Sequence, residues 1–241
     1  MTPSNGIGMI EVRGGVMLRA DPARESCFTV VHHQDDMAHL GDEYPPTPAS
    51  QREKLHTDFN NEIQSLEIAA QTLVDFPDAP WVLRTELARQ CWDETRHARL
   101  CLIRLEAKGG YKGEFPIINQ EWGVVCRFDS LAARLAVQNR LFEGGSLDVL
   151  QELVGMWADV GDHDTSDVTD AIIADEVRHV GFGNEWLDEI RKANPRDFLK
   201  ALAAMNELGL IATALAPAIE SEMPHDVAVN NEDRARAGFS T

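Results

Sequence analysis

The chain of 241 residues has few cysteines, few basic residues and no long apolar run, and each absence narrows what the protein can be. Its four cysteines are scattered along the chain: Cys27, Cys91, Cys101 and Cys126. They form no Cys-x-x-Cys pair, which excludes a built-in rubredoxin or zinc ribbon of the usual spacing. No run of about 18 apolar residues exists, so no membrane span is predicted. The first nine residues lack a basic region followed by an apolar core, so we expect no signal peptide and a cytoplasmic protein.

Positive charge is also scarce. The 22 Lys and Arg residues stand against 40 Asp and Glu residues, a formal net charge of −18. Such a surface repels nucleic acid and anionic lipid, which disfavours both as partners. The hydrophobic content of 44% is ample for a packed core. The composition therefore favours a globular protein that acts on something other than a polyanion.

Two short motifs organise the chain. Residues 93–97 and 175–179 both read Asp-Glu-x-Arg-His, and both lie in long segments predicted to be helical. Residues three apart in a helix lie about 60° apart around the axis, so the Glu and His of each motif point the same way. These pairs are Glu94 with His97 and Glu176 with His179. Carboxylate beside imidazole suits iron or manganese, and two such pairs on facing helices are what a dinuclear site needs.

A dinuclear site of this kind also needs one carboxylate from each of two other helices. Glu62 precedes Glu94 by 32 residues (94 − 62), and Glu143 precedes Glu176 by 33 residues (176 − 143). Each interval fits a helical hairpin that turns and returns to the same level. The chain therefore reads as two equivalent halves, each with a Glu followed by a Glu-x-x-His.

The first hairpin is predicted from local signals. A helix should begin at Thr47-Pro48, turn at residues 75–80, and continue as a second helix over about 80–108. Glu67 is a rival to Glu62 as the ligand of the first helix. Five residues correspond to about 140° around a helix, so both cannot face one site. The matching intervals of the two halves select Glu62.

The second half begins after a crossover loop at residues 110–116, and a third helix is predicted over about 119–143. Gly144 and Gly145 follow the candidate ligand Glu143 directly, and two interpretations stay open. Either the helix ends at Gly144 and Ser146 caps a new one, or the helix carries a π-bulge or an unwound turn beside the ligand. The second interpretation would open room for dioxygen and a substrate.

The remaining segments are a fourth helix over about 165–193, a fifth over about 196–215 and a polar tail, expected to be poorly ordered unless it docks. The fifth helix should pack outside the bundle or at a homodimer contact. Residues 1–46 are interpreted as an irregular extension and candidate lid, 47–216 as the helical domain, and 217–241 as the tail. His32, His33 and His39 have the residue type of metal ligands, but their spacing favours a polar loop.

The two Asp-Glu-x-Arg-His motifs and their partner glutamates resemble the ferritin-like superfamily of di-iron carboxylate proteins over roughly residues 48–195. The chain is most similar to a poorly characterised ferritin-like family of unknown function, on the pattern of residues 61–69 and the Gly183-Asn184 ending. That family tends to read Glu-Ala-Arg-Gly-Leu-Asp in its third helix, whereas residues 143–148 read Glu-Gly-Gly-Ser-Leu-Asp. The tRNA-hydroxylating branch is a more distant resemblance.

The resemblance implies an all-α fold: an antiparallel four-helix bundle with an extra C-terminal helix and an irregular N-terminal extension. It implies two iron ions, with Mn/Fe or Mn/Mn as alternatives to Fe/Fe. Their ligands would be Glu62, Glu94, His97, Glu143, Glu176 and His179. It further implies that Asp93 accepts a hydrogen bond from His179 and Asp175 one from His97, while Arg96 and Arg178 balance the charge behind the site.

Three functions compete at this point. The first is an oxygen-activating di-iron oxidase or oxygenase that acts on a small organic molecule with dioxygen and an external electron donor. In it Glu94 and Glu176 would bridge the metals, Glu62 and Glu143 would be terminal ligands, and each histidine would bind one iron. The second is iron handling or peroxide defence without an organic substrate. The third is a structural bundle with buried salt bridges.

Overall fold

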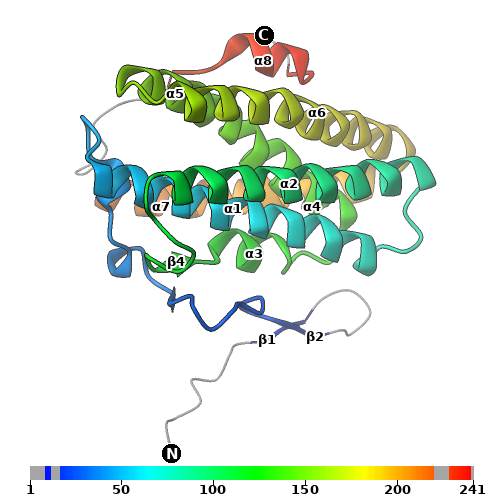
Figure 1. Ribbon diagram of the computed structural model, residues 1–241. Helices are drawn as coiled ribbons and strands as arrows, with labels where there is room; N and C mark the ends of the chain where they lie inside the picture. Colours follow the sequence, from blue (N-terminus) through cyan, green and yellow to red (C-terminus); the bar gives the residue numbers. More distant parts are fainter. Residues whose placement is uncertain (1–8, 12–16, 220–227, 240–241) are drawn as a thin grey trace, which may run out of the picture. The chain divides into compact units, whose positions relative to one another are not determined.

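The structure is a computed structural model that describes residues 9–11, 17–219 and 228–239. It is mostly helical with a few short strands (Figure 1), as an all-α fold predicts. The chain divides into two compact units, Met1–Arg127 and Phe128–Thr241, each of which is described by itself. No helix within the described ranges is both long and apolar enough to cross a bilayer.

The first unit is built on a hairpin of two long helices, α1 (Pro48–Asp75) and α2 (Trp81–Ala107), which lie side by side (Figure 1). The first and last residues of both helices agree with the sequence prediction. The start of α1 is set by a capping box, in which the Thr47 hydroxyl accepts the backbone N–H of Ser50 and the Ser50 hydroxyl accepts that of Thr47. The hairpin buries a stripe of apolar side chains from both helices: Leu55, Phe59, Ile68, Leu83, Leu87 and Leu105.

Short elements surround this hairpin. Strands β1 (Met9–Glu11) and β2 (Met17–Arg19) form an antiparallel pair. Strand β3 (Val30–Val31) pairs in parallel with β4 (Ile117–Ile118), which joins the extension to the crossover loop. The 3-10 turns η2 (Gln34–Asp36) and η3 (Leu40–Asp42) and the short helix α3 (Gln120–Val125) complete the unit.

A row of polar side chains on α1 holds these segments in place. Glu53 accepts the backbone N–H of Gly41, and Nε2 of His56 accepts that of Gly113 at 2.9 Å. Further along, Gln64 donates to the carbonyl of Ile118 at 3.3 Å. Backbone groups of two loops and of the short strand β4 thus bond to one face of a helix. The N-terminal extension and the crossover loop therefore pack on the same face of α1. A lid function of the extension stays a prediction.

The second unit begins with a broken helix, so the single helix predicted over 119–143 is wrong. After α3 the chain leaves the helical conformation and resumes as α4 (Leu131–Leu135), followed by a π-helical segment, η4 (Ala136–Phe142). Arg134, only 1% exposed, donates through Nε to the carbonyl of Phe128 at 3.0 Å. In a continuous helix the Phe128 carbonyl would accept a backbone N–H of the next turn, and here the Arg134 side chain takes that place. Helical periodicity does not reveal such a side-chain bond.

Helix α5 (Glu143–Asp159) then continues without a stop, so the interpretation that a helix ends at Gly144 is wrong. The alternative, a π-bulge beside Glu143, is confirmed by η4. Gly144 has a packing reason instead: a Cβ there would lie 3.0 Å from the ring of Phe239. Ser146 does not cap a new helix, and its hydroxyl donates to the carbonyl of Phe142 at 3.2 Å.

Helix α6 (His163–Ala193) packs against α5, as the ribbon shows (Figure 1), and its first turn is capped by the Asp162 carboxylate. Helix α7 (Pro195–Ile219) follows and contacts α4, η4 and α6, where its Ala201 and Ala204 are buried. Both helices match the predicted segments within a few residues.

The described part of the C-terminal tail docks on the second unit. Its short helix α8 (Asn231–Arg236) places Arg234 against Asp148 of α5, with Nη2 2.5 Å from Oδ2. Asn184 of α6 donates to the carbonyl of Ala237 at 2.7 Å. The guanidinium carbon of Arg140 lies over the Phe239 ring, 4.5 Å from the ring centroid. The exception foreseen for the tail, that it is ordered where it docks, therefore applies to residues 228–239.

The docking should depend on the charge of Asp148. Hydrogen bonds from Arg234 and from the Asn230 N–H hold the pKa of Asp148 below its usual value. A carboxyl with a depressed folded pKa adds stability above its unfolded pKa and loses it as pH falls through the folded pKa. We expect Asp148→Asn to release the C-terminal segment at neutral pH, seen as faster tryptic cleavage after Arg234. Asp188→Asn, on the exposed face of α6, should leave that cleavage rate unchanged.

Candidate metal centre

The first unit holds a triad made by Glu62 of α1 with Glu94 and His97 of α2. The Nδ1 atom of His97 lies 3.2 Å from Oε2 of Glu62 and 3.2 Å from Oε2 of Glu94. Glu94 and His97 are almost fully buried, and the side chain of Glu62 is 14% exposed. One ligand atom from each residue lies within 4.8 Å of the others. The Glu-x-x-His spacing on α2 and the hairpin to α1 thus bring together three predicted ligands.

The second unit holds an equivalent triad of Glu143 from α5 with Glu176 and His179 from α6. Nδ1 of His179 lies 3.2 Å from Oε2 of Glu176, the same atoms and the same distance as in the α2 pair. All three residues are buried, at 4%, 2% and 1% exposure. Their ligand atoms also lie within 4.8 Å of one another. Each half of the chain therefore brings together a Glu-x-x-His pair and a glutamate of the preceding helix.

An amide side chain orients one carboxylate in each triad, which the sequence analysis missed. Gln90 donates to Oε1 of Glu94 at 3.2 Å, four residues along α2. Gln138 donates to Oε1 of Glu143 at 2.6 Å, five residues along η4. Residues four apart stack in an α-helix, whereas a π-helix stacks residues five apart. The π segment therefore puts Gln138 over Glu143, a pairing that α-helical spacing conceals.

These distances fit a metal site. Ligands about 2.1 Å from one ion and at right angles to each other lie about 3 Å apart, close to the imidazole–carboxylate separations of both triads. Buried carboxylates are costly unless paired or bound to a cation. Mixed carboxylate and imidazole donors suit first-row transition metals. Each triad is therefore positioned to hold a metal ion.

The rival carboxylate of α1 faces elsewhere. Oε1 of Glu67 accepts a hydrogen bond from Nη1 of Arg24 at 2.8 Å, in the N-terminal extension. Burial raises the pKa of Glu67, and the neighbouring guanidinium opposes that rise. Glu62 and Glu67 thus serve different faces of α1, as their angular separation predicts. That Glu62 binds metal stays a prediction.

Two aspartates and two arginines are predicted to lie behind the site, and the structure shows the contacts of Asp93 and Arg96. Asp93 accepts hydrogen bonds from Arg96 at 2.5 Å and from Arg89 at 3.3 Å, both on its own helix. Arg96 thus balances a buried carboxylate next to Glu94, as proposed for it. The pairings Asp93 with His179 and Asp175 with His97 would join the two units and stay predictions, as does the role of Arg178.

The N-terminal histidines take part in neither triad. His32 lies 3.5 Å from the carboxylate of Asp21, and His39 contacts the carbonyl of Gln34. Within the described ranges, ligand-type atoms gather in the two triads and not around these histidines. A polar loop, the favoured interpretation, agrees with this. Of the cysteines on α2, Cys101 is buried and Cys91 is half-buried.

A close helix contact supports the second triad. Asn139 of η4 donates to the carbonyl of His179 at 3.3 Å. This approach requires Gly183, because a Cβ there would lie 2.4 Å from Cβ of Asn139. Asn184 accepts a hydrogen bond from Arg140 of the same π segment. The Gly-Asn pair that ends the α6 motif therefore fixes the π segment beside the histidine, a role that its sequence did not disclose.

Fold and site together define a mostly helical protein with buried Glu and His groups positioned to hold metal. A family model described as "Protein of unknown function (DUF455)" matches residues 13–241, nearly the whole chain, and the chain belongs to that family. No curated protein and no solved structure matches it. The family carries no known activity, so function must be argued from the site.

The glycines of α6 offer a matched pair for testing the contact with η4. Gly183→Ala should lower the free energy of unfolding by about 1–3 kcal/mol, because the new Cβ overlaps Cβ of Asn139, which cannot move without its backbone. Gly181→Ala, two residues away and with nothing within 4 Å of its Cβ, should be neutral or stabilising by up to about 1 kcal/mol. Chemical denaturation of the metal-free proteins compares them. Equal effects would mean that α6 does not approach η4 this closely.

The two glutamates of α1 give a second matched pair. Glu62→Ala should strongly lower the metal content of the purified protein, since it removes one of three donors from the first triad. Glu67→Ala should leave it unchanged, because Glu67 pairs with Arg24. Elemental analysis of both variants after the same metal loading decides the assignment. The reverse result would place the ligand at Glu67 and break the equivalence of the two halves.

Proposed function

We propose that the protein is an oxygen-activating dinuclear iron oxidase or oxygenase that acts on a small organic molecule. The observation that carries the proposal is the repetition of a buried Glu-x-x-His pair, with the same atoms at the same distance, in both halves of the chain, each beside a glutamate of the preceding helix. A single Glu-x-x-His pair is common in helices. Two copies, each completed by a glutamate of the preceding helix, are what a two-metal carboxylate site requires.

In this proposal the two triads face each other inside an antiparallel four-helix bundle of the ferritin-like type, built by α1, α2, η4 with α5, and α6. Glu94 and Glu176 would be the carboxylates shared by the two metals, since each comes from a helix that also supplies a histidine. Glu62 and Glu143 would be terminal ligands, and His97 and His179 would each hold one metal. The four carboxylates, of total charge −4, neutralise two divalent cations.

The donor set favours Fe/Fe, with Mn/Fe and Mn/Mn as the alternatives. When bound, a reduced iron pair supplies electrons to dioxygen, and an external donor restores it. The chain's own side chains would hold the metals and orient the carboxylate ligands. Gln90 and Gln138 fix one oxygen of Glu94 and Glu143, which leaves the other oxygen to face the metal.

The π segment supports an enzyme rather than a purely structural bundle. A π-helix is a less stable form of the backbone, and it is frequent at functional sites. Here it spans seven residues and ends directly before a predicted ligand. A bundle stabilised by buried ion pairs alone would gain nothing from this irregularity.

The test loads the protein with Fe(II) under anaerobic conditions and then admits dioxygen. We expect about two irons per chain, rapid consumption of dioxygen and an optical change that accompanies iron oxidation. His97→Ala should reduce all three, because it removes the only nitrogen donor of the first triad. His163→Ala, an exposed histidine at the start of α6, should behave like the wild type.

Three outcomes would replace the proposal. Mineralisation of excess Fe(II) by an assembly of many subunits, measured by native mass spectrometry, would favour iron storage. Turnover of peroxide without any organic substrate would favour peroxide defence. If the purified protein binds no transition metal and unfolds identically with and without iron, the hypothesis of a structural bundle is favoured.

A further inference from the structure

The C-terminal segment, residues 228–239, packs on the part of the second unit that follows the π segment. Its helix α8 lies along α5 and α6 (Figure 1). Ala237 is 1% exposed and belongs to one apolar cluster with Leu147 of α5 and Val180 of α6. Leu147 follows Glu143 by one turn of α5. The segment therefore docks next to the helix turn that carries a predicted ligand.

The end of this segment also contacts the π segment η4 itself. The Phe239 ring lies against the guanidinium of Arg140, a residue of η4, and 3.0 Å from the place that a Cβ of Gly144 would take. Asn184 of α6 joins the two, because it accepts a hydrogen bond from Arg140 and donates one to the carbonyl of Ala237 at 2.7 Å. The C-terminal segment thus bonds to η4 both directly and through Asn184.

Few groups hold the segment in place. Of residues 228–239, only Asp233 and Ala237 are buried. The main polar contact is the ion pair of Arg234 with Asp148 on α5, which also accepts the backbone N–H of Asn230 at 2.8 Å. A segment with so little buried surface opens far more readily than a whole domain unfolds. It can therefore detach and dock again while the long helices stay folded.

The π segment, in turn, depends on support from outside. A π-helix is less stable than an α-helix. Its register brings Gln138 to Glu143, five residues later, where the amide donates to Oε1 at 2.6 Å. If η4 relaxed to α-helical spacing, residues five apart would point about 140° away from each other, and this bond would break. Contacts that keep η4 in the π conformation therefore also orient Glu143.

From these contacts we infer that residues 228–239 form a detachable strap, which keeps η4 in the π conformation while it is docked and lets it relax when it detaches. The docked strap preserves the bond of Gln138 to Glu143, and its release frees Glu143 to turn away from His179. The strap thus acts on the second triad, whose glutamate follows η4. Its effect on η4 is independent of any metal, whereas its effect on metal binding rests on the proposed function.

Hydrogen exchange of the metal-free, full-length protein, measured by mass spectrometry, tests the strap. Arg234→Gln removes the ion pair with Asp148 and should raise the exchange rate of residues 136–143 about tenfold or more, because a hydrogen bond between charged groups is lost. Arg236→Gln makes the same charge change in α8 but affects only a bond to Asp233 of that helix, so it should leave the rate unchanged. Peptides of α1 should exchange as in the wild type.

Phe239→Ala separates contact with η4 from docking of α8. It removes the ring from Arg140 and Gly144 but leaves the ion pair of Arg234 intact. Exchange of residues 136–143 should again be faster than in the wild type, while tryptic cleavage after Arg234 stays slow. If neither Arg234→Gln nor Phe239→Ala speeds exchange in η4, or if exchange rises equally throughout the protein, the inference is overturned.

Anaerobic titration with Fe(II) tests the consequence for metal binding. The wild type should bind two ions, and Arg234→Gln should bind one of them about tenfold more weakly or worse. Gln138→Ala should weaken the same ion, because it removes the bond to Glu143, yet leave the exchange of residues 228–239 unchanged. Faster exchange in η4 with unaltered binding of both ions would overturn control of the triad by the strap. A wild type that binds no metal would overturn the proposed function instead, and the exchange rates would then decide the strap by themselves.

Discussion

The burial of carboxylates next to imidazoles is the constraint on which the rest of the structure depends. Glu94, Glu143 and Glu176 are buried, and an isolated negative charge would be strongly unfavourable there. Each triad brings acceptor atoms close to one imidazole nitrogen, which concentrates negative charge at one point in each hairpin. Such an arrangement is stable only if cations or protons compensate it. The hairpins hold the triads rigidly enough for a metal ion to serve that purpose.

The second hairpin is not a plain copy of the first. The first half reaches Glu62 along a regular helix, while the second reaches Glu143 through a π segment held by Arg134 at its start and by Asn139 near its middle. The docked C-terminal residue Phe239 rests on the segment through Arg140 and on Gly144. Helix α6 and the C-terminal segment, both remote in sequence, therefore stabilise the π segment.

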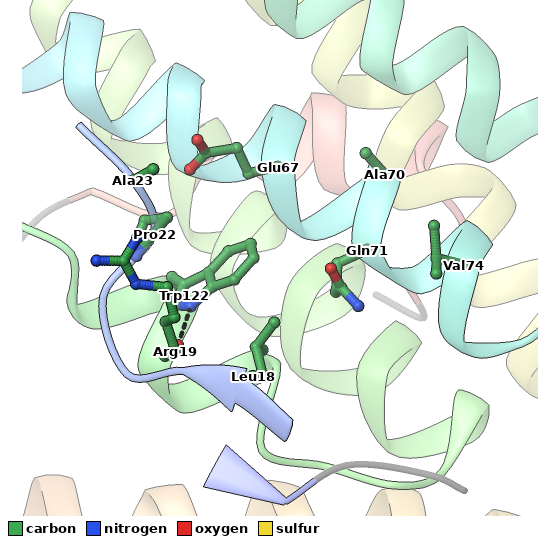
Figure 2. Close-up of a pocket in the computed structure, with 9 residues that line it drawn as sticks. All are labelled: Leu18, Arg19, Pro22, Ala23, Glu67, Ala70, Gln71, Val74 and Trp122. Atoms are coloured by element: carbon green, nitrogen blue, oxygen red, sulfur yellow. Dashed lines mark hydrogen bonds between the residues drawn. The ribbon is translucent and has the colours of Figure 1, made fainter. Parts of the chain in front are cut away.

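Helix α1 has two polar faces with different tasks. Glu62 faces the histidine of α2, while Glu53, His56 and Gln64 face loop backbones and Glu67 faces Arg24. Backbone groups of the N-terminal extension bond both to side chains of α1 and to the short strand pairs. A pocket beside Glu67 is lined by Ala70 and Val74 of α1 and by Trp122 of α3 (Figure 2).

Much of this protein was determined by its sequence alone. Capping signals, helical periodicity and turn residues located α1, α2, α6 and α7 within a few residues, and the repeated Glu-x-x-His spacing placed both triads, because these features depend on residues near each other in the chain. What only the tertiary structure decided depends on contacts between distant residues. The approach of Gly183 to Asn139 and the docking of residues 228–239 arise in this way. The break before Arg134 and the π register that brings Gln138 to Glu143 join residues only five or six positions apart, but at spacings that an α-helix does not use. Helical periodicity records which face of a helix is buried, but it does not record which distant group replaces a lost backbone hydrogen bond.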